Sequence, residues 1–135
     1  MDIVIGATFG DEGKGLITHH LASRHGRDSI VVRFNGGAQA GHTVVTKNSK
    51  RHVFRHVGSG TFAGAATFLS QFFISNPILF LEELKELKNL KLKPKVYIDP
   101  ESPITTPYDM MINQMAEEFR GNQRHGSCGV GFAET

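Results

Sequence analysis

Apolar and polar residues alternate along the first third of the chain in a pattern that predicts a strand, a helix and a second strand. Asp2–Ile5 is a short β-branched run, typical of a buried parallel strand. Glu12–Arg24 has the spacing of a helix, and Ser29–Phe34 predicts the second strand. This order and spacing indicate a right-handed βαβ unit. The common stripe expected on the helix comprises Leu16, Ile17, His20 and Leu21.

The middle of the chain predicts a hairpin followed by a helix. Val44–Thr46 and His52–His56 are extended runs on either side of a polar turn. Asn76 is a favourable N-cap and Pro77 suits the first helical position, so we expect a helix from there to about Leu90. The apolar positions expected in the core are Phe72, Phe73, Ile78, Leu81, Leu84 and Leu87.

The last third predicts a strand, a helix and a glycine-rich loop. Lys95–Asp99 is the strand, and Thr106 caps the following helix, with Asp109 placed favourably in its first turn. Arg120–Gly131 is the loop. We therefore expect one α/β domain over residues 1–135, with a mostly parallel central sheet and flanking helices.

The composition limits which partners and compartments fit the chain. Hydrophobic residues make up 39% of it, enough for a core, and the formal charge of +2 is too balanced to indicate nucleic acid or an anionic membrane. Polar residues and Pro77 interrupt Thr61–Leu81, the most apolar stretch, so we expect no membrane span. The N-terminus lacks a signal-peptide pattern, and a single cysteine, Cys128, suits a reducing compartment. We expect a cytoplasmic protein.

A glycine-rich turn directly follows the first predicted strand and carries the chemistry that phosphate binding needs. Residues 5–15 read Ile-Gly-Ala-Thr-Phe-Gly-Asp-Glu-Gly-Lys-Gly. Glycines let backbone N–H groups approach an anion, and the following helix N-terminus adds a favourable dipole. The turn is P-loop-like but does not match G-x-x-x-x-G-K-[ST], because Thr8 replaces the first glycine and Gly15 replaces the metal-binding hydroxyl. Asp11 is the nearest alternative metal ligand, and Lys14 supplies a mobile positive charge.

Two more glycine loops follow, and together with the first they resemble a known family. Residues 10–15 read G-D-E-G-K-G and residues 36–43 read G-G-A-Q-A-G-H-T. Members of the adenylosuccinate synthetase family carry G-D-E-G-K-G and G-G-x-N-A-G-H-T in this order and spacing. Residues 126–131, G-S-C-G-V-G, stand where the family has G-T-T-G-x-G. The resemblance covers the whole chain and implies the N-terminal portion of a larger synthetase fold, with the loops meeting in one crevice.

The resemblance implies a ligase that joins L-aspartate to the 6-position of IMP, forming adenylosuccinate through a 6-phosphoryl intermediate, with GTP hydrolysis and Mg²⁺. Asp11 would remove the N1 proton and bind the metal, together with the carbonyl of Gly41. His42 would be the general acid at the 6-oxygen, and Lys14 would neutralise charge on the γ-phosphate. The implied nucleotide-binding set is Gly10, Asp11, Glu12, Gly13, Lys14, Gly15, Gln39, Ala40, Gly41, His42, Thr43, Ser127 and Cys128.

Two departures from the family pattern leave the acceptor nucleotide open. Gln39 replaces an asparagine that faces the purine nucleotide. Cys128 replaces a threonine that contacts phosphate, and since a thiol is a poor donor, Ser127 would take over. These features resemble phage relatives that make 2-aminoadenylosuccinate from dGMP with ATP or GTP. Many of those relatives have serine at the position of Asp11, so the aspartate here favours the ordinary 6-oxopurine reaction.

The family enzyme is more than twice as long as this chain. Its guanine-recognition motif, its aspartate-binding loop and a nucleotide-contacting arginine from the second subunit all lie beyond Thr135. We therefore expect an N-terminal fragment of a homodimeric enzyme, inactive alone, with no nucleic-acid or membrane partner. A nucleotide-binding module without bond-forming chemistry is the alternative from a different class.

Overall fold

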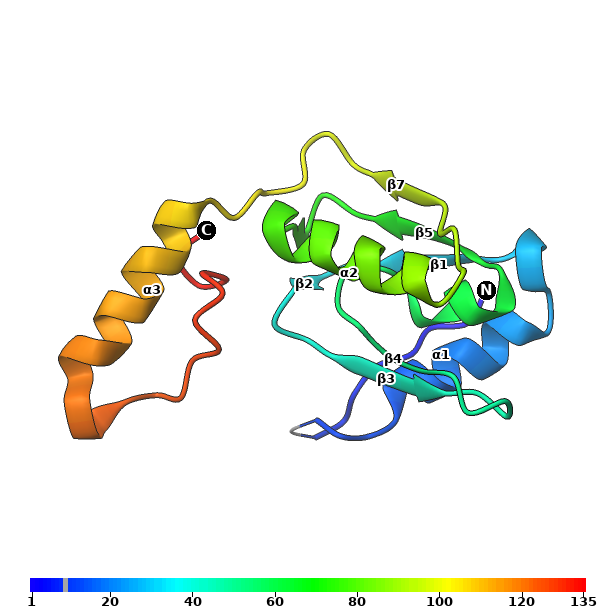
Figure 1. Ribbon diagram of the computed structural model, residues 1–135, viewed down its shortest axis with the longest axis horizontal. Coiled ribbons are helices and arrows are strands. Elements are labelled where there is room, and N and C mark those ends of the chain that lie inside the picture. The colour runs from blue at the N-terminus through cyan, green and yellow to red at the C-terminus, as the bar shows by residue number, and fades with distance from the viewer. Residues whose placement is uncertain (9) are drawn as a thin grey trace.

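The computed structural model describes residues 1–8 and 10–135 and confirms the α/β prediction (Figure 1). Phe9, within the first glycine loop, lies outside the described residues. In chain order the elements are α1 (Lys14–Ser23), η1 (Gly26–Asp28), β1 (Ile30–Arg33), β2 (Gly36–Gly37), β3 (His42–Val45), β4 (Arg51–Phe54), η2 (Ser59–Ala63), β5 (Ala66–Leu69), β6 (Phe73–Ile74), α2 (Pro77–Asn89), β7 (Val96–Ile98), α3 (Pro107–Arg120) and η3 (Gly121–Gln123).

The central sheet is parallel, with strand order β1–β5–β7. Ile30 lies opposite Ala66, and Thr67 lies opposite Val96. The strands β1 and β7 and the hairpin of β3 and β4 confirm their predictions, whereas β5 and β6 were not predicted. β5 reads Ala-Thr-Phe-Leu inside a longer, mostly apolar stretch, so its four residues do not stand out as a separate strand. The short strands β2 and β6 also pair in parallel, and β2 is the beginning of the second glycine loop.

The predicted strand over residues 2–5 is wrong. This segment pairs with no strand among the described residues, and Ile3 and Ile5 are 71% and 73% exposed. An apolar, β-branched sequence favours a strand only where a neighbour supplies backbone donors and acceptors. The predicted βαβ unit is therefore absent from the described residues, and β1 pairs with β5 instead.

Helix α1 starts two residues later than predicted and buries a different face. Gly13 is its N-cap, and the backbone there is left-handed with φ of +75°. The predicted inward residues Leu16 and Ile17 are half exposed, whereas Gly15 and Ala22 are buried. The helix approaches η2 so closely that a Cβ on Gly60 would lie 2.8 Å from the Cβ of Ala22. Small residues rather than large ones therefore form this contact.

Helix α2 covers one side of the molecule, next to the central sheet in Figure 1. Asn76 caps it as predicted, accepting a hydrogen bond from the N–H of Leu79 at 3.2 Å. The predicted face is partly wrong, because Ile78 and Leu81 are exposed while Glu83 is buried. The exposed Phe72 is likewise outside the core that Phe73 joins. The buried cluster comprises Val44, Phe54, Val57 and Leu87, packed against Phe62, Phe80, Leu84, Leu92 and Val96.

Helix α3 lies to one side of the sheet and is reached by an extended segment, and the C-terminal loop folds back along it (Figure 1). Thr106 and Asp109 form the capping box expected at its start. The buried residues of α3 are polar, Asn113 and Glu117, and face the third glycine loop. Within residues 1–8 and 10–135, the helices are too short or too polar to span a bilayer.

Candidate functional site

The first glycine loop is closed by its own Glu12. Its Oε1 accepts the backbone N–H groups of Ala7 and Thr8, each at 2.7 Å, and Oε2 lies 2.8 Å from Nζ of Lys14. The Lys14 ammonium first, and then the Thr8 and Ala7 amides, lower the pKa of Glu12 to about 2. The pair lies over Gly6, where an added Cβ would collide with the Glu12 carboxylate. Glu12 therefore stabilises the conformation of the first glycine loop through contacts with residues of the loop itself.

Asp11 lies at the exposed tip of this loop. Its backbone is left-handed, with φ of +53°, between Gly10 at +116° and Gly13 at +75°. A non-glycine residue in this region is uncommon and, among side chains, aspartate tolerates it well. The loop thus presents the Asp11 carboxylate to solvent at the point where the chain turns into α1.

The first and second glycine loops meet where α1 begins. A Cβ placed on Gly15 would lie 2.7 Å from the Cβ of His42 and 3.1 Å from its Cα. Contacts this short leave room only for glycine. The sequence therefore brings the start of α1 against the start of β3, and the predicted residues Lys14, Gly15 and His42 belong to one neighbourhood.

His42 is half-buried in this neighbourhood and is neutral at pH 7. Burial first, and then the positive charges of Arg33 and Lys14, lower the pKa of His42 to about 4, although Glu83 opposes the shift. A neutral imidazole still carries one N–H donor. The next residue, Thr43, is exposed and paired with Val53 in the hairpin.

A pocket of about 390 Å³ adjoins the first loop. Glu12 and Lys14 line one part of it, and residues 2–5 with Ile17 and Leu21 of α1 line the rest. The Glu12–Lys14 ion pair therefore faces a pocket whose other lining residues are mostly apolar.

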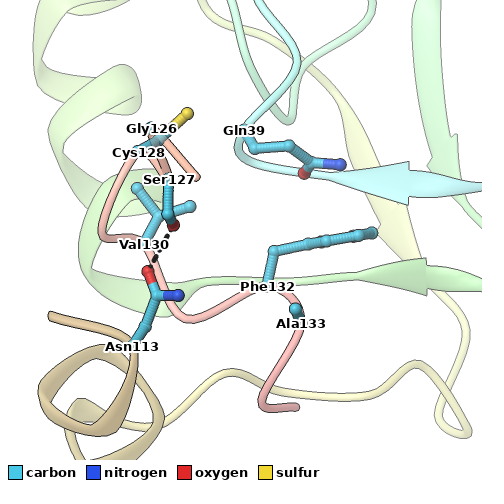
Figure 2. A pocket seen from close by; sticks show the side chains of 8 residues that line it. All are labelled: Gln39, Asn113, Gly126, Ser127, Cys128, Val130, Phe132 and Ala133. Atoms are coloured by element: carbon cyan, nitrogen blue, oxygen red, sulfur yellow. Dashed lines mark hydrogen bonds between the residues drawn. The ribbon is translucent and has the colours of Figure 1, made fainter. Parts of the chain in front are cut away.

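A different pocket, of about 200 Å³, lies between the second and third glycine loops (Figure 2). Gln39 lines it from the second loop, with its side chain extending past the Phe132 ring, whereas Ser127 and Cys128 line it from the third loop. The ring of Phe132 packs on Gly37, where an added Cβ would lie 2.8 Å from Cδ2 of the ring. Ser127 donates its hydroxyl hydrogen to Oδ1 of Asn113 at 2.7 Å. The pocket-lining residues are Gln39, Asn113, Gly126, Ser127, Cys128, Val130, Phe132 and Ala133.

The predicted site residues thus fall into two groups. Lys14, Gly15 and His42 meet at α1 and β3, whereas Gln39, Ser127 and Cys128 share the pocket between the later loops. Asp11, Lys14 and His42 do not line that pocket. Among the other predicted residues, Ala40 donates its N–H to the Gly37 carbonyl, and Gly41 packs against Val53.

A buried charged network behind the site was missed from the sequence. The Glu83 carboxylate accepts the N–H groups of Arg55 at 2.9 Å and His56 at 2.7 Å. Arg33 donates to the Arg55 carbonyl at 2.7 Å and lies over the Phe73 ring. Arg33 lies within an otherwise apolar strand, and a charge is rarely buried without a partner. Its position in the sequence could therefore have indicated a buried charged network.

Asn113 and Glu117 were also missed, although they are four residues apart and lie on one helical face. Their spacing places two polar side chains toward the third loop. The signal was hidden by a stronger apolar stripe on α3, which is exposed: Tyr108, Met111, Ile112, Met115 and Phe119.

Metal binding would have to rely on few protein ligands. Within the described residues no three His, Cys, Asp or Glu side chains gather closely enough to hold an ion. Mg²⁺ typically takes one or two carboxylates and fills its shell with phosphate oxygens and water. The exposed carboxylate of Asp11 and the exposed backbone of Gly41 fit that oxygen-ligand chemistry.

Comparison with known proteins covers nearly the whole chain. The family model described as adenylosuccinate synthetase matches residues 3–135. The adenylosuccinate synthetase of Borrelia duttonii is 36% identical over 129 residues, which are 96% of this chain and 29% of that protein. That of Picrophilus torridus is 36% identical over 132 residues, 98% of this chain and 31% of that protein. The chain thus spans about a third of the length of these curated relatives.

Solved structures show the same relationship. Fully ligated adenylosuccinate synthetase from Plasmodium falciparum superposes with a TM-score of 0.78 at 26% identity, covering 95% of this chain and 30% of that one. The succinoaminodeoxyadenylate synthetase of cyanophage S-2L, solved with dGMP and dATP, superposes with a TM-score of 0.64. It is 16% identical and covers 79% of this chain and 30% of its own, so it supports the fold alone.

Proposed function

The chain belongs to the adenylosuccinate synthetase family, and we propose that it supplies the proton-transfer and phosphate-binding loops of a ligase. The complete enzyme, a homodimer, would join L-aspartate to the 6-position of IMP with GTP hydrolysis. The observation that carries this proposal is the contact between Gly15 and His42. It joins the two most specific family motifs, residues 10–15 and 36–43, although positions 15 and 42 are 27 residues apart in the sequence.

The chemistry divides among three side chains. The Asp11 carboxylate takes the N1 proton of the purine, so that the 6-oxygen can attack the γ-phosphate of GTP. Lys14 stabilises the negative charge that develops on the transferring group, and His42 donates a hydrogen bond to the 6-oxygen. The amine of aspartate then displaces the 6-phosphate, with loss of a proton. Glu12, Gly10 and Gly13 hold the loop in which Asp11 and Lys14 lie.

Mg²⁺, when bound, supplies charge neutralisation to the phosphates. Asp11 and the carbonyl of Gly41 would hold it. Gly15 and Thr43 would line the GTP phosphates, and Gln39, Ala40, Ser127 and Cys128 would contact the nucleotide monophosphate.

The test is Asp11→Asn in the full-length protein that carries this chain. Asparagine keeps the size of the side chain and tolerates a left-handed backbone, so folding is spared while the base is lost. We expect turnover to fall by about 10²–10⁴-fold, as for loss of a general base. The control is Asp28→Asn, an exposed carboxylate in η1. A variant at Asp11 that keeps near-normal turnover would rule out this assignment.

Assays with different nucleotides would identify the acceptor and the phosphoryl donor. Gln39 is one methylene longer than the family asparagine and lines the pocket next to Cys128, which favours testing dGMP as a second acceptor. Product mass with IMP or dGMP, each with GTP or ATP, separates adenylosuccinate from 2-aminoadenylosuccinate formation. A protein that binds nucleotides and forms neither product would be a binding module.

A further inference from the structure

Glu117 on α3 is a buried carboxylate for which the proposed chemistry has no use. Its side chain is 12% exposed. Oε2 accepts the backbone N–H groups of Gly126 at 2.9 Å and Ser127 at 3.2 Å, and Oε1 accepts that of His125 at 3.3 Å. Burial opposes ionisation, but hydrogen bonds from Arg120 and from these amides lower the pKa of Glu117 to about 2. Glu117 is therefore an anion held by the third glycine loop.

The amides that hold Glu117 form an anion-binding cradle. Three consecutive N–H groups, from residues 125 to 127, converge on one carboxylate, and the backbone of Gly126 is left-handed with φ of +76°. Successive N–H groups in such a turn make a concave site for anions, including phosphates. Gly126 and Ser127 also line the pocket shared with Gln39. The cradle therefore lies at the edge of the proposed nucleotide site.

The other polar groups of the loop are engaged by the same helix. The Ser127 hydroxyl donates to Asn113, whose Nδ2 donates to Glu134 at 2.8 Å. Gln114 donates to the Gly129 carbonyl at 3.0 Å. A phosphate approaching the loop finds the amides of residues 125–127 already hydrogen-bonded, and it must displace Glu117 to use them.

We propose that Glu117 is an internal anion that occupies this amide cradle and competes with the phosphate of the nucleotide monophosphate. The inference rests on the proposed function and adds to it a residue that positions the third loop. Because Glu117 is tethered to α3, it is always present at high effective concentration. The competition lowers the apparent affinity for a phosphate without changing contacts to the purine.

The test compares Glu117→Gln with Glu118→Gln in the full-length protein. Glu118 is the adjacent exposed carboxylate on α3, so both variants lose one charge and only one weakens the cradle contact. The dissociation constants of IMP and of inosine are measured by calorimetry. We expect Glu117→Gln to bind IMP about 5- to 10-fold more tightly, because a neutral side chain competes less well than a carboxylate for the loop amides. Inosine binding should be unchanged. Weaker IMP binding, or an equal change for inosine, would overturn the proposal.

A second measurement uses the unaltered protein and does not depend on ligase function. The ¹³C resonance of the Glu117 carboxyl group is followed during titration with inorganic phosphate. Displacement predicts a change in this resonance and a higher pKa for Glu117 in the phosphate-bound state. A Glu117 signal that stays constant at all phosphate concentrations contradicts the proposal. If phosphate shifts the signal while no purine nucleotide binds, the proposed function fails; the displacement of Glu117 by phosphate then stands, and its competition with a nucleotide does not.

Discussion

The contact of Gly15 with His42 shows how single residues assemble this site. Sequence motifs identified both residues, but only the structure shows why position 15 must be glycine, since a Cβ there would collide with His42. The family resemblance indicated roles for Asp11, Lys14 and His42. It did not indicate that Glu12 closes the first loop on itself, because that depends on where a flexible side chain finds two free amides.

Gly15→Ala tests this contact. Forcing a methyl group into a well-packed contact costs roughly 1–3 kcal/mol, more than the roughly 0.5–1 kcal/mol that alanine gains over glycine in a helix. We expect lower stability in urea denaturation, together with reduced turnover as His42 shifts. His20→Ala, on the exposed side of α1, is the control and should unfold near the midpoint of the unaltered protein. A stabilised Gly15→Ala variant would contradict the contact.

His42 should give the protein an acid-sensitive stability. Its pKa is about 4 when folded and 6.5 in a model peptide, so the unfolded state binds more protons between these values. Stability from this group is present above pH 6.5 and is lost as the pH falls toward 4. Histidine NMR should show the low pKa without nucleotide and a higher pKa with it, because phosphates favour the imidazolium. A His42 pKa near 6.5 without nucleotide would disprove the assigned burial.

At the scale of elements, the helix caps could be predicted from adjacent residues, whereas one strand and the buried face of α2 could not. The caps at Asn76 and Thr106 depend on adjacent residues and were predicted correctly. The strand over residues 2–5 depends on a neighbour that the described chain does not place beside it. The inward face of α2 was misjudged because Glu83, an apparent surface residue, is satisfied by the amides of another segment.

Helix α2 is tied to the segment after β4 by Glu83. Burial raises the pKa of Glu83, but the neighbouring His52 and His56 rings and hydrogen bonds from the Arg55 and His56 amides outweigh it and lower the pKa to about 2. Stability from this group is present above pH 4.5, the ordinary pKa of a glutamate, and is lost as the pH falls toward 2. We expect Glu83→Gln to lower unfolding free energy at pH 7 by about 3–5 kcal/mol, as for breaking a buried pair.

The matched control for that variant is Glu82→Gln, the neighbouring exposed carboxylate. It should unfold within about 0.5 kcal/mol of the unaltered protein, as surface substitutions usually do. Equal urea midpoints for the two variants would show that the Glu83 carboxylate does not contribute to the free energy of unfolding.

At the scale of the whole molecule, the chain corresponds to one part of the longer proteins that it resembles. It spans about a third of its curated relatives, and apolar residues lie exposed on β1, β7 and α3. Its glycine loops are shaped by internal carboxylates: Glu12 binds amides of the first and Glu117 binds amides of the third. In the ligand-free protein these backbone amides are therefore already hydrogen-bonded to carboxylates of the same chain.

The central claim is that the first two loops together direct phosphoryl transfer to the 6-oxygen of a purine nucleotide. The most direct measurement supplies the full-length protein with IMP labelled with ¹⁸O at the 6-position, GTP and L-aspartate. The account predicts that the label appears in inorganic phosphate as adenylosuccinate forms, and that Asp11→Asn abolishes this transfer. Product formation with the label released as water, or undiminished transfer in the Asp11 variant, would contradict it.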